Sequence, residues 1–583
     1  IEADIVSEIH KYVTGISDQH PDVQFGDSQA QGHFCGYLAA HRQVDVYKTI
    51  RLDQLHRTSP TCRLCRVLVE TIDQQEINQN WEHTTLTIVP TYYRDTFFVT
   101  GLNPDTGAVE HSSLFFLFTP SEFSATADFP FMVGFGMEVV PGDTSTDSSL
   151  AWAKEKIKTC ISDHACSHGA RASSLLTRVL DVSYRSGHEG TVKLLATDRQ
   201  DATYACLSHC WGDTSRMLKT TTETLSSHLN GIAIADLPRS FQDAVDITRR
   251  LGIRYLWVDS LCIIQDCKKD WDSEAQRMAE IYEGSHVTIA TTDSLNGDGG
   301  CYRRPTKEIN HGTIWYTGDD GEKIAIYSRQ PHDHFKMKMD GREGSGGDES
   351  SPPLWKRGWV YQERLLSLRV LHFCRRDLLS ECRAGNQCQC GKREPEVGPK
   401  ETFAQLLTGD AALDSRQSHR GWWAMTRQYS QLRLTFEKDV LLALSGIARR
   451  IGDTRPTEDD YLCGIWKSTL PYGLLWYVPD PNLESPAGSY PQRASDPRVP
   501  SWSWASVVGP IRWWLPSPDF ALFAAQASPI SVRCLWFKPD MGLVLRPTDE
   551  GKFERIGLVH GWRGGELLTS QQLRQLVGTI EVV

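Results

Sequence analysis

Side chains that can bind and polarise a small molecule follow three apolar runs in the middle of the chain. The first run ends in Ser208 and leads to His209, Trp211, Gly212 and Asp213; the second leads to Asp259, Ser260 and Cys262, and the third to Thr292 and Asp293. Hydroxyl, imidazole and carboxylate groups can orient a phosphate or a water molecule, and an indole ring can stack on a base. Structural alternatives exist for each type, because a strand-end aspartate can cap the next turn, and histidines and tryptophans are common in cores.

A fourth segment adds Arg357, Trp359 and Glu363. We take Glu363, Asp259 and His209 as the catalytic candidates, and as substrate-binding candidates Ser208, Trp211, Gly212, Asp213, Ser260, Arg357 and Trp359. The alternative for Glu363 is a buried structural ion pair with Arg357 or Arg364. A Cys210 or Cys262 nucleophile with His209 as its base is also chemically open, although no spacing favours it.

The elements that must position these residues alternate between strand and helix. Short apolar runs predict strands at residues 204–208, 253–258, 286–291 and 369–373. Helical spacing predicts helices at 237–251, 270–283 and 359–366, with Asp270 capping the second and Gly252 just past the first. Because this order implies right-handed parallel crossovers, the strands should end at one edge of a sheet, where such folds bind ligands. We therefore expect Ser208, Trp211, Asp259 and Glu363 to border one cavity.

The regions on either side of this α/β centre are less regular. Before it we predict a helix at 61–72, strands at 84–90 and 113–118, and a helix at 149–162; after it we predict a helical region at 421–451 and then short strands. A glycine-, acid- and serine-rich stretch at 340–351 is predicted to be a mobile loop in front of the helix that carries Glu363. The predicted class is α/β with α+β extensions at both ends.

Size and composition exclude several classes of protein. The chain has 583 residues, of which 40% are hydrophobic and 23% charged, as is typical of a soluble multidomain protein. Its formal charge of −11 makes nucleic acid and anionic lipid poor partners. The sequence contains no run of about 18 apolar residues, so we expect no membrane-spanning helix. The first residues show no secretion signal, which favours the cytoplasm.

Three groups among the 16 cysteines have ligand-like spacing. They are Cys62 with Cys65, then Cys160 with His164 and Cys166, and then Cys382 with Cys388 and Cys390. No single group supplies the four nitrogen or sulfur donors of tetrahedral zinc, so we favour buried small hydrophobic residues over a structural zinc. We assign no metal ligand and no certain cofactor, and expect reduced thiols without a disulfide framework.

Four segments, in this order, resemble the fungal heterokaryon-incompatibility (HET) family. They are YACLSHCWG (204–212), LPRSFQDAVDITRRLGIRYLWVDSLCIIQD (237–266), DWDSEAQRMAEIYEGSHVTIA (270–290) and RGWVYQERLLSLRVLHF (357–373). The resemblance extends outward to CISDHAC (160–166), ECRAGNQCQCG (381–391) and PSWSWAS (500–506), so that it covers about residues 150–510.

The resemblance implies a protein of self/non-self recognition and cell death, with a central fold remotely similar to the flavodoxin-like, doubly wound sheet of TIR domains. It implies an N-terminal region at 1–195, a HET domain at 196–375 and a C-terminal region at 376–583. Some TIR domains hydrolyse NAD through a glutamate in a W-C-x-x-E helix, and Trp359 and Glu363 have that spacing here, with Val360 in place of the cysteine. By this resemblance NAD or NADP is the expected substrate. Glu363 would hold a ribose diol and stabilise the oxocarbenium-like charge as the glycosidic bond breaks.

Two other functions stay open. One is a non-catalytic signalling module that assembles with a protein partner or as a homo-oligomer. The other is a biosynthetic enzyme that acts on a small-molecule metabolite, because a fold does not fix its chemistry.

Overall fold

The computed structural model of the chain divides into two compact units, each described here by itself. The first unit comprises Ile1–Gly142, Arg304–His334 and Gln389–Lys392, and the second comprises Asp143–Arg303, Phe335–Cys388 and Arg393–Val583. The structure describes residues 48–61, 63–74, 84–89, 96–102, 109–120, 134–140, 142–164, 166, 176–183, 190–197, 202–215, 217–304, 312–317, 321, 323–329, 352–375, 377–391, 398–408, 415–457, 459–470, 472–479, 492–496, 498–513, 533–538, 541–547 and 553–560. The predicted loop at 340–351 and Cys62 lie outside these residues, and the domain division at 195 and 375 stays a prediction.

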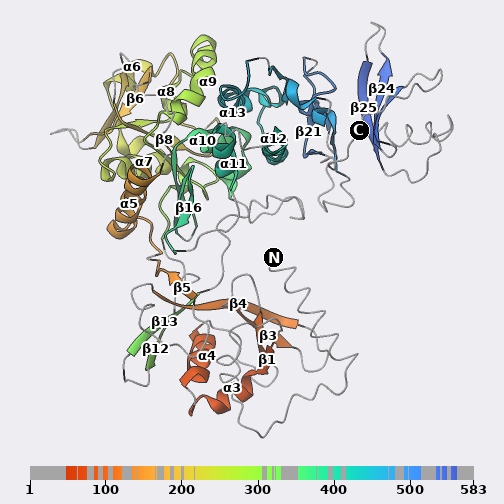
Figure 1. Ribbon diagram of the computed structural model, residues 1–583. Coiled ribbons are helices and arrows are strands. Elements are labelled where there is room, and N and C mark those ends of the chain that lie inside the picture. The colour runs from red at the N-terminus through yellow and green to blue at the C-terminus, as the bar shows by residue number, and fades with distance from the viewer. Residues whose placement is uncertain are drawn as a thin grey trace. The chain divides into compact units, whose positions relative to one another are not determined.

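In the part of the first unit that the structure describes, a mainly antiparallel sheet packs with two helices (Figure 1). Its strands run in the order β1-β2-β3-β4-β13-β12, with β5 paired to β4. Their bounds are β1 Lys48–Arg51, β2 Thr84–Val89, β3 Thr96–Leu102, β4 Val109–Pro120, β5 Gly134–Met137, β12 Gly312–Thr317 and β13 Lys323–Arg329. The helices are α3 (Leu52–Thr58) and α4 (Arg63–Gln74), and α4 buries an i, i+3, i+4, i+7 stripe made of Cys65, Leu68, Val69 and Ile72. The elements predicted at 61–72, 84–90 and 113–118 are thus confirmed.

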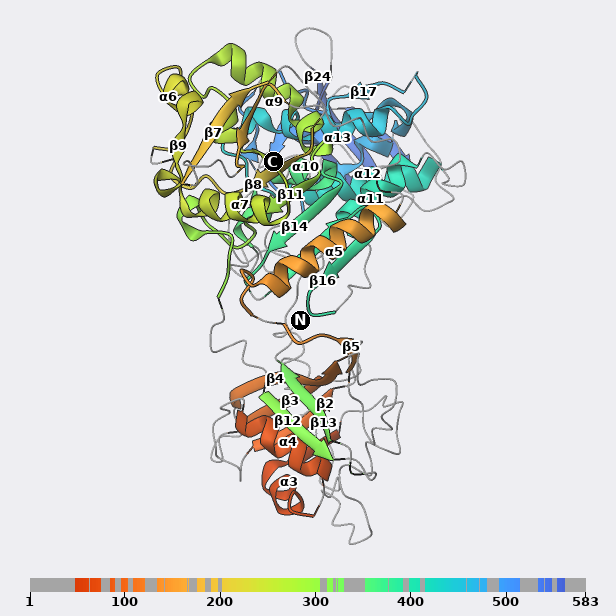
Figure 2. The same cartoon turned by 90° about the vertical axis from the view of Figure 1, so that its left-hand side faces the viewer.

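A nine-stranded sheet with a parallel centre forms the framework of the second unit (Figure 2). The order is β16-β15-β14-β11-β8-β10-β6-β7-β9. β14, β11, β8 and β10 pair in parallel, and the strands on both sides of them pair antiparallel. The bounds are β6 Arg178–Asp181, β7 Thr191–Ala196, β8 Tyr204–Ser208, β9 Ile232–Ala233, β10 Tyr255–Trp257, β11 Val287–Ala290, β14 Arg369–Phe373, β15 Leu378–Cys382 and β16 Gly385–Cys388. The α/β class and all four predicted central strands are confirmed.

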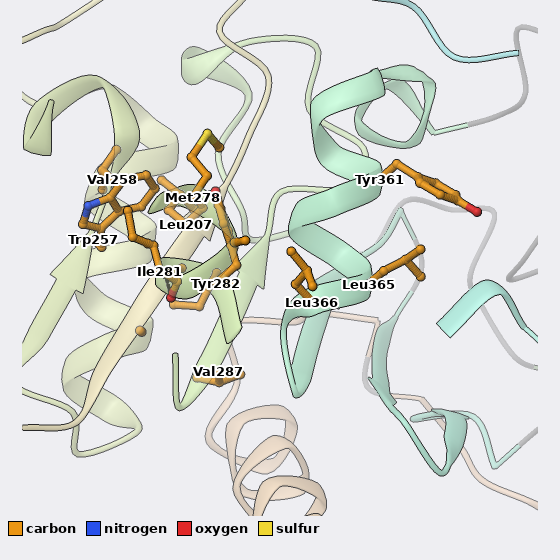
Figure 3. Packing of buried hydrophobic residues seen from close by; sticks show 14 of the residues in the cluster. Leu207, Trp257, Val258, Met278, Ile281, Tyr282, Val287, Tyr361, Leu365 and Leu366 are labelled. Carbon is orange, nitrogen blue, oxygen red and sulfur yellow. Dashed lines mark hydrogen bonds between the residues drawn. The ribbon is translucent and has the colours of Figure 1, made fainter. Parts of the chain in front are cut away.

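Helices precede and connect the parallel strands, and the three predicted at 237–251, 270–283 and 359–366 are confirmed among them. They are α5 (Asp147–Asp163), α6 (Leu225–Asn230), α7 (Arg239–Arg250), α8 (Asp259–Cys262), α9 (Lys268–Glu283) and α10 (Gly358–Leu366). Gly252, with φ of 80°, follows α7 in the left-handed conformation that glycine adopts most easily. Figure 3 shows Met278 and Tyr282 of α9 beside Leu207 of β8, while Tyr361 of α10 points away from them. Burial of Met278 and Tyr282 fixes α9 on the sheet.

One predicted cap is wrong. α9 begins at Lys268, two residues before Asp270, so that Asp270 lies in its first turn. The Asp270 carboxylate accepts a hydrogen bond from Arg178 Nη2 at 2.7 Å and another from the backbone of Ile264 at 2.8 Å. These contacts tie the helix to β6 and to the preceding loop. Asp270 therefore binds residues outside α9 and does not cap its own helix.

The rest of the second unit is helical and then made of short strands. Its helices are α11 (Pro399–Leu407), α12 (Ser415–Tyr429) and α13 (Leu442–Gly452). Its strands are β17 Tyr461–Leu462, β18 Ile465–Trp466, β19 Trp476–Tyr477, β20 Gln492–Arg493, β21 Val507–Val508, β22 Arg512–Trp513, β23 Arg533–Lys538, β24 Met541–Pro547 and β25 Phe553–His560. The indoles of Trp422 and Trp504 both donate to the carbonyl of Gly464, at 3.0 and 2.9 Å. These two tryptophans are therefore core anchors.

Candidate functional site

Several of the candidate residues meet where the parallel strands of the second unit end. β8 lies between β10 and β11, with Trp257 opposite Cys206 and Ala290 opposite Ser208. Because the three strands run in the same direction, the residues that follow them share one edge of the sheet, which is where ligands bind in open parallel sheets. Glu363, near the end of α10, reaches the same edge, since the charge of Asp259 and the hydroxyl of Ser208 both act on its carboxyl group.

Asp259 lies at the centre of this cluster. Its carboxylate accepts a hydrogen bond from the indole of Trp211 at 2.8 Å and one from the backbone N–H of Ser260 at 2.7 Å. His209 Nδ1 lies 3.8 Å from the same carboxylate. Asp259 therefore holds the loop after β8 against the start of α8. The side chain is also 19% exposed, so a ligand can reach it.

His209 is a buried, neutral histidine. Its ring packs edge-on against Phe241, with 5.0 Å between the ring centres. Burial lowers the pKa of His209 to about 4, although the charge of Asp259 acts in the opposite direction. A base with so low a pKa removes protons poorly at neutral pH. The geometry therefore favours a hydrogen-bonding role for His209 over the base that the sequence suggested.

The Glu363 side chain is deeply buried. Only 5% of its surface is exposed, and burial raises the pKa of its carboxyl group to about 7, with a further rise from the charge of Asp259. The nearby Ser208 hydroxyl and Arg357 guanidinium limit this rise. At neutral pH the group is thus divided between acid and carboxylate, as general acids and bases in enzymes often are.

The ion pair with Arg364 that was the structural alternative for Glu363 is wrong. Arg364 instead forms two hydrogen bonds of 2.8 Å to Glu381, because its side chain points from α10 towards β15. Arg357 donates a short hydrogen bond to the backbone carbonyl of His209. Within the described part of the chain, Glu363 takes part in no ion pair with either arginine.

Three further candidates make contacts with other parts of the fold. They are Trp359, Gly212 and Asp213. The indole of Trp359 donates to Asp439, at 3.3 Å, in the C-terminal part of the second unit. Gly212 has a φ of 66°, and a Cβ atom there would lie 2.5 Å from the Cβ of Asn296. Asp213 is exposed and accepts a hydrogen bond from the backbone of Ser215 at 2.9 Å. The substrate-binding roles predicted for these three residues stay predictions.

Tyr282 belongs to the cluster although the sequence marked it only as part of the apolar face of α9. Its hydroxyl donates to the carbonyl of Leu207 at 3.3 Å, and it lies close enough to Glu363 to lower the pKa of that carboxyl group. A tyrosine on an apolar stripe carries no sequence signal for such a role, because the stripe predicts burial and says nothing of the hydroxyl.

Three polar atoms at this edge are buried without a hydrogen bond of standard geometry to any described residue, although one of them, the Ser208 hydroxyl oxygen, lies near the Glu363 carboxyl group. They are Ser208 Oγ, His209 Nε2 and Ser260 Oγ. Burying a polar atom without a partner costs about 1–3 kcal/mol, so such atoms are rare in structural cores. Together with the near-neutral Glu363, they can serve a small polar ligand by donating or accepting hydrogen bonds and by exchanging a proton.

The cysteines that lie together in the structure differ from those that the sequence grouped by spacing. Cys160, His164 and Cys166 lie together with Cys382, which the sequence had placed in a different group. Cys388 donates instead to Asp377, at 2.9 Å. All thirteen described cysteines are free thiols.

Comparison with known proteins gives a family match for the segment that carries the site. Residues 204–363 match the family model described as Heterokaryon incompatibility protein (HET), which confirms the resemblance seen in the motifs. The match begins at β8 and ends at Glu363, so it contains every candidate residue of the site. No curated protein and no solved structure matches the chain. Among the helices that the structure describes, none has the length and apolarity needed to cross a membrane.

Proposed function

Because residues 204–363 match the HET family model, we propose that the protein acts in self/non-self recognition and cell death by hydrolysing the nicotinamide glycosidic bond of NAD or NADP. The single observation that carries this proposal is Glu363, a buried carboxyl group whose pKa is raised to about 7 at the edge where the parallel strands end. A TIR-like, doubly wound core is part of the same proposal, since it gives this glutamate its expected position.

The main requirement of this reaction is a negative charge placed next to the ribose. Nicotinamide leaves as a neutral ring, and the ribose gains oxocarbenium-like positive charge that the Glu363 carboxylate stabilises. A water molecule then adds to the ribose carbon and gives its proton to the same carboxylate, which releases ADP-ribose. A low-dielectric surrounding strengthens the attraction between the carboxylate and the developing charge.

The remaining residues of the cluster bind and orient the substrate. The hydroxyls of Ser208 and Ser260 have unused hydrogen-bonding capacity for ribose or phosphate oxygens. Asp259, fixed by Trp211 and by the backbone of Ser260, can accept a hydrogen bond from a ribose hydroxyl. Arg357 supplies positive charge near the diphosphate, while its own bond to the carbonyl of His209 fixes its direction.

We infer that the protein works in a reducing compartment, the cytoplasm. The thirteen free cysteines support this, because oxidising compartments usually pair such thiols. The partners in this proposal are a nucleotide substrate and a further protein or a second copy of the chain.

Incubating the purified chain with NAD, NADP and ATP, followed by product analysis, tests the proposal. We expect nicotinamide and ADP-ribose from NAD, with kcat/KM rising with pH through about 7 as Glu363 ionises. Glu363→Gln should lower turnover by roughly 10²-fold or more, because the carboxamide carries no charge. Glu223→Gln, an exposed glutamate of the same domain, is the matched control and should leave turnover unchanged.

Two results would reject the hydrolase. Equal turnover of the wild type and the Glu363 variant would remove that residue from catalysis. Unchanged NAD and NADP in the wild type would favour the other two functions. A metabolite bound to the purified chain would then indicate a biosynthetic enzyme, and concentration-dependent assembly without any product would indicate a signalling module.

A further inference from the structure

Three thiols and one imidazole converge at a place remote in sequence from the candidate site. The ligand atoms of Cys160, His164, Cys166 and Cys382 all lie within 4.8 Å of one another. Cys382 Sγ and His164 Nδ1 are 3.3 Å apart. The three cysteines are buried, and the histidine is half-buried. This is the donor set of a Cys₃His centre.

The end of α5 delivers three of these four side chains. Cys160 lies in its last turn, and His164 follows directly as the residue that ends the helix, with an extended backbone (φ −106°, ψ 142°). This change of direction brings Cys166 back towards Cys160, so three donors come from seven consecutive residues. Figure 2 shows α5 lying along β14 and β16 of the second unit, and Cys382 at the end of β15 provides the fourth donor.

We propose that Cys160, His164, Cys166 and Cys382 bind one structural Zn²⁺ ion. Zinc bonds of about 2.3 Å to sulfur and about 2.0–2.1 Å to nitrogen, in a tetrahedron, place neighbouring donor atoms roughly 3.5 Å apart. The 3.3 Å contact between Cys382 Sγ and His164 Nδ1 is close to this spacing and no pair of the four ligand atoms is more than 4.8 Å apart, so only small side-chain movements are needed. Thiolate and imidazole ligands select zinc over calcium or magnesium, which prefer oxygen.

Buried small hydrophobic residues, the alternative favoured by the sequence, explain this cluster less well. Among the described residues, the cluster of buried apolar side chains at this place contains only the three cysteines. A histidine nitrogen directed at a cysteine sulfur is a polar contact, which apolar packing does not require. The free state of all three thiols also leaves each of them able to ionise and bind a metal.

Nearby arginines match the charge of the proposed centre. Three thiolates and a neutral imidazole around Zn²⁺ carry one net negative charge. Arg369 Nη1 lies 3.9 Å from Cys160 Sγ, and Arg383 Nη1 donates to the backbone carbonyl of Cys166 at 3.4 Å. Cationic groups that surround metal ligands in this way stabilise the thiolate form.

The proposed ion would connect segments that flank the HET match. His164 and Cys382 are 218 positions apart, one before residue 204 and the other after residue 363. With four protein ligands, no position remains open for a substrate, so the role is structural. Binding would hold α5 on the β15 side of the sheet, in the way that structural zinc contributes to the stability of small domains.

Metal analysis of the full chain, purified without chelator from zinc-supplemented medium and freed of any tag, tests this proposal. We expect about one zinc per wild-type chain. Cys382→Ser should lose it, and Cys267→Ser, at the N-cap of α9, is the matched control that should keep it. After exchange with Co²⁺, the wild type should show the thiolate-to-cobalt charge-transfer band and the intense visible bands of a tetrahedral site.

A second variant keeps the test decisive if Cys382→Ser does not fold. His164→Cys converts the donor set to four thiolates and should keep the metal while strengthening the charge-transfer band. A wild type that takes up neither zinc nor cobalt would overturn the proposal. So would equal zinc in the wild type and in Cys382→Ser, or loss of zinc caused only by Cys388→Ser. Since Glu363→Gln should leave the zinc content unchanged, this test is independent of the proposed hydrolysis.

Discussion

Replacing Glu363 by glutamine should make the stability of the protein depend less on pH. Burial raises the pKa of this carboxyl group from its usual 4.5 to about 7, which means that folding favours the protonated form. The contribution of Glu363 to stability is therefore fully present below pH 4.5. It is lost as the pH rises through about 7, where the folded protein must also hold the charge.

The difference between the two pKa values corresponds to at most about 3 kcal/mol of unfolding free energy. Glutamine keeps the size of the side chain and stays neutral at every pH. The variant and the wild type should then have similar stability at pH 5. Above pH 8 the variant should be the more stable protein, by up to about 3 kcal/mol.

Urea unfolding of both proteins between pH 5 and 8.5, followed by tryptophan fluorescence, measures this difference. Glu223→Gln serves as the control, because that side chain is exposed and its replacement should change neither curve. If the variant is less stable than the wild type at every pH, Glu363 is an ionised group with a buried partner and our account of its environment is wrong. A difference that does not change with pH would refute it equally.

Three further changes test other parts of the second unit. Asp259→Ala should destabilise the fold by about 1–3 kcal/mol, measured by urea unfolding, because an indole N–H and a backbone N–H both lose their acceptor. Glu381→Gln should cost about 3–5 kcal/mol in the same assay, since it removes the negative charge of the buried carboxylate that accepts two hydrogen bonds from Arg364; an effect below about 1 kcal/mol would contradict the network. Gly212→Ala should lower the melting temperature, because its φ of 66° and the 2.5 Å approach to Asn296 both oppose a Cβ atom, and unchanged melting would show that this loop is not fixed as described.

Local pattern was sufficient for the elements of the central sheet. The runs at 204–208 and 369–373 are strands with those bounds, because a strand buried on both faces needs a continuous apolar segment. The apolar stripes of α7 and α9 had the period of a helix, and their buried faces agree with it. The order of these elements then implied parallel pairing, which β8, β10 and β11 have.

The hairpin of β12 and β13 could not be assigned from its sequence. It lies within the HET match, between β11 and α10, yet it belongs to the sheet of the first unit, because β13 pairs with β4 and β12 pairs with β13. A strand's own residues predict that it is extended, but its partner is fixed by side-chain packing with distant segments. Sequence order alone therefore could not show that this hairpin belongs to the sheet of the first unit.

By itself, the sequence determined the α/β class, the central elements, the HET resemblance and the edge of the sheet at which polar residues gather, because each of these depends on spacing within short segments. Tertiary structure alone decided the depth at which Glu363 is buried, the partner of Arg364, the place of Tyr282 in the cluster and the meeting of Cys382 with Cys160 and His164. These properties arise from atoms contributed by remote segments, whose distances and desolvation exist only after the chain has packed.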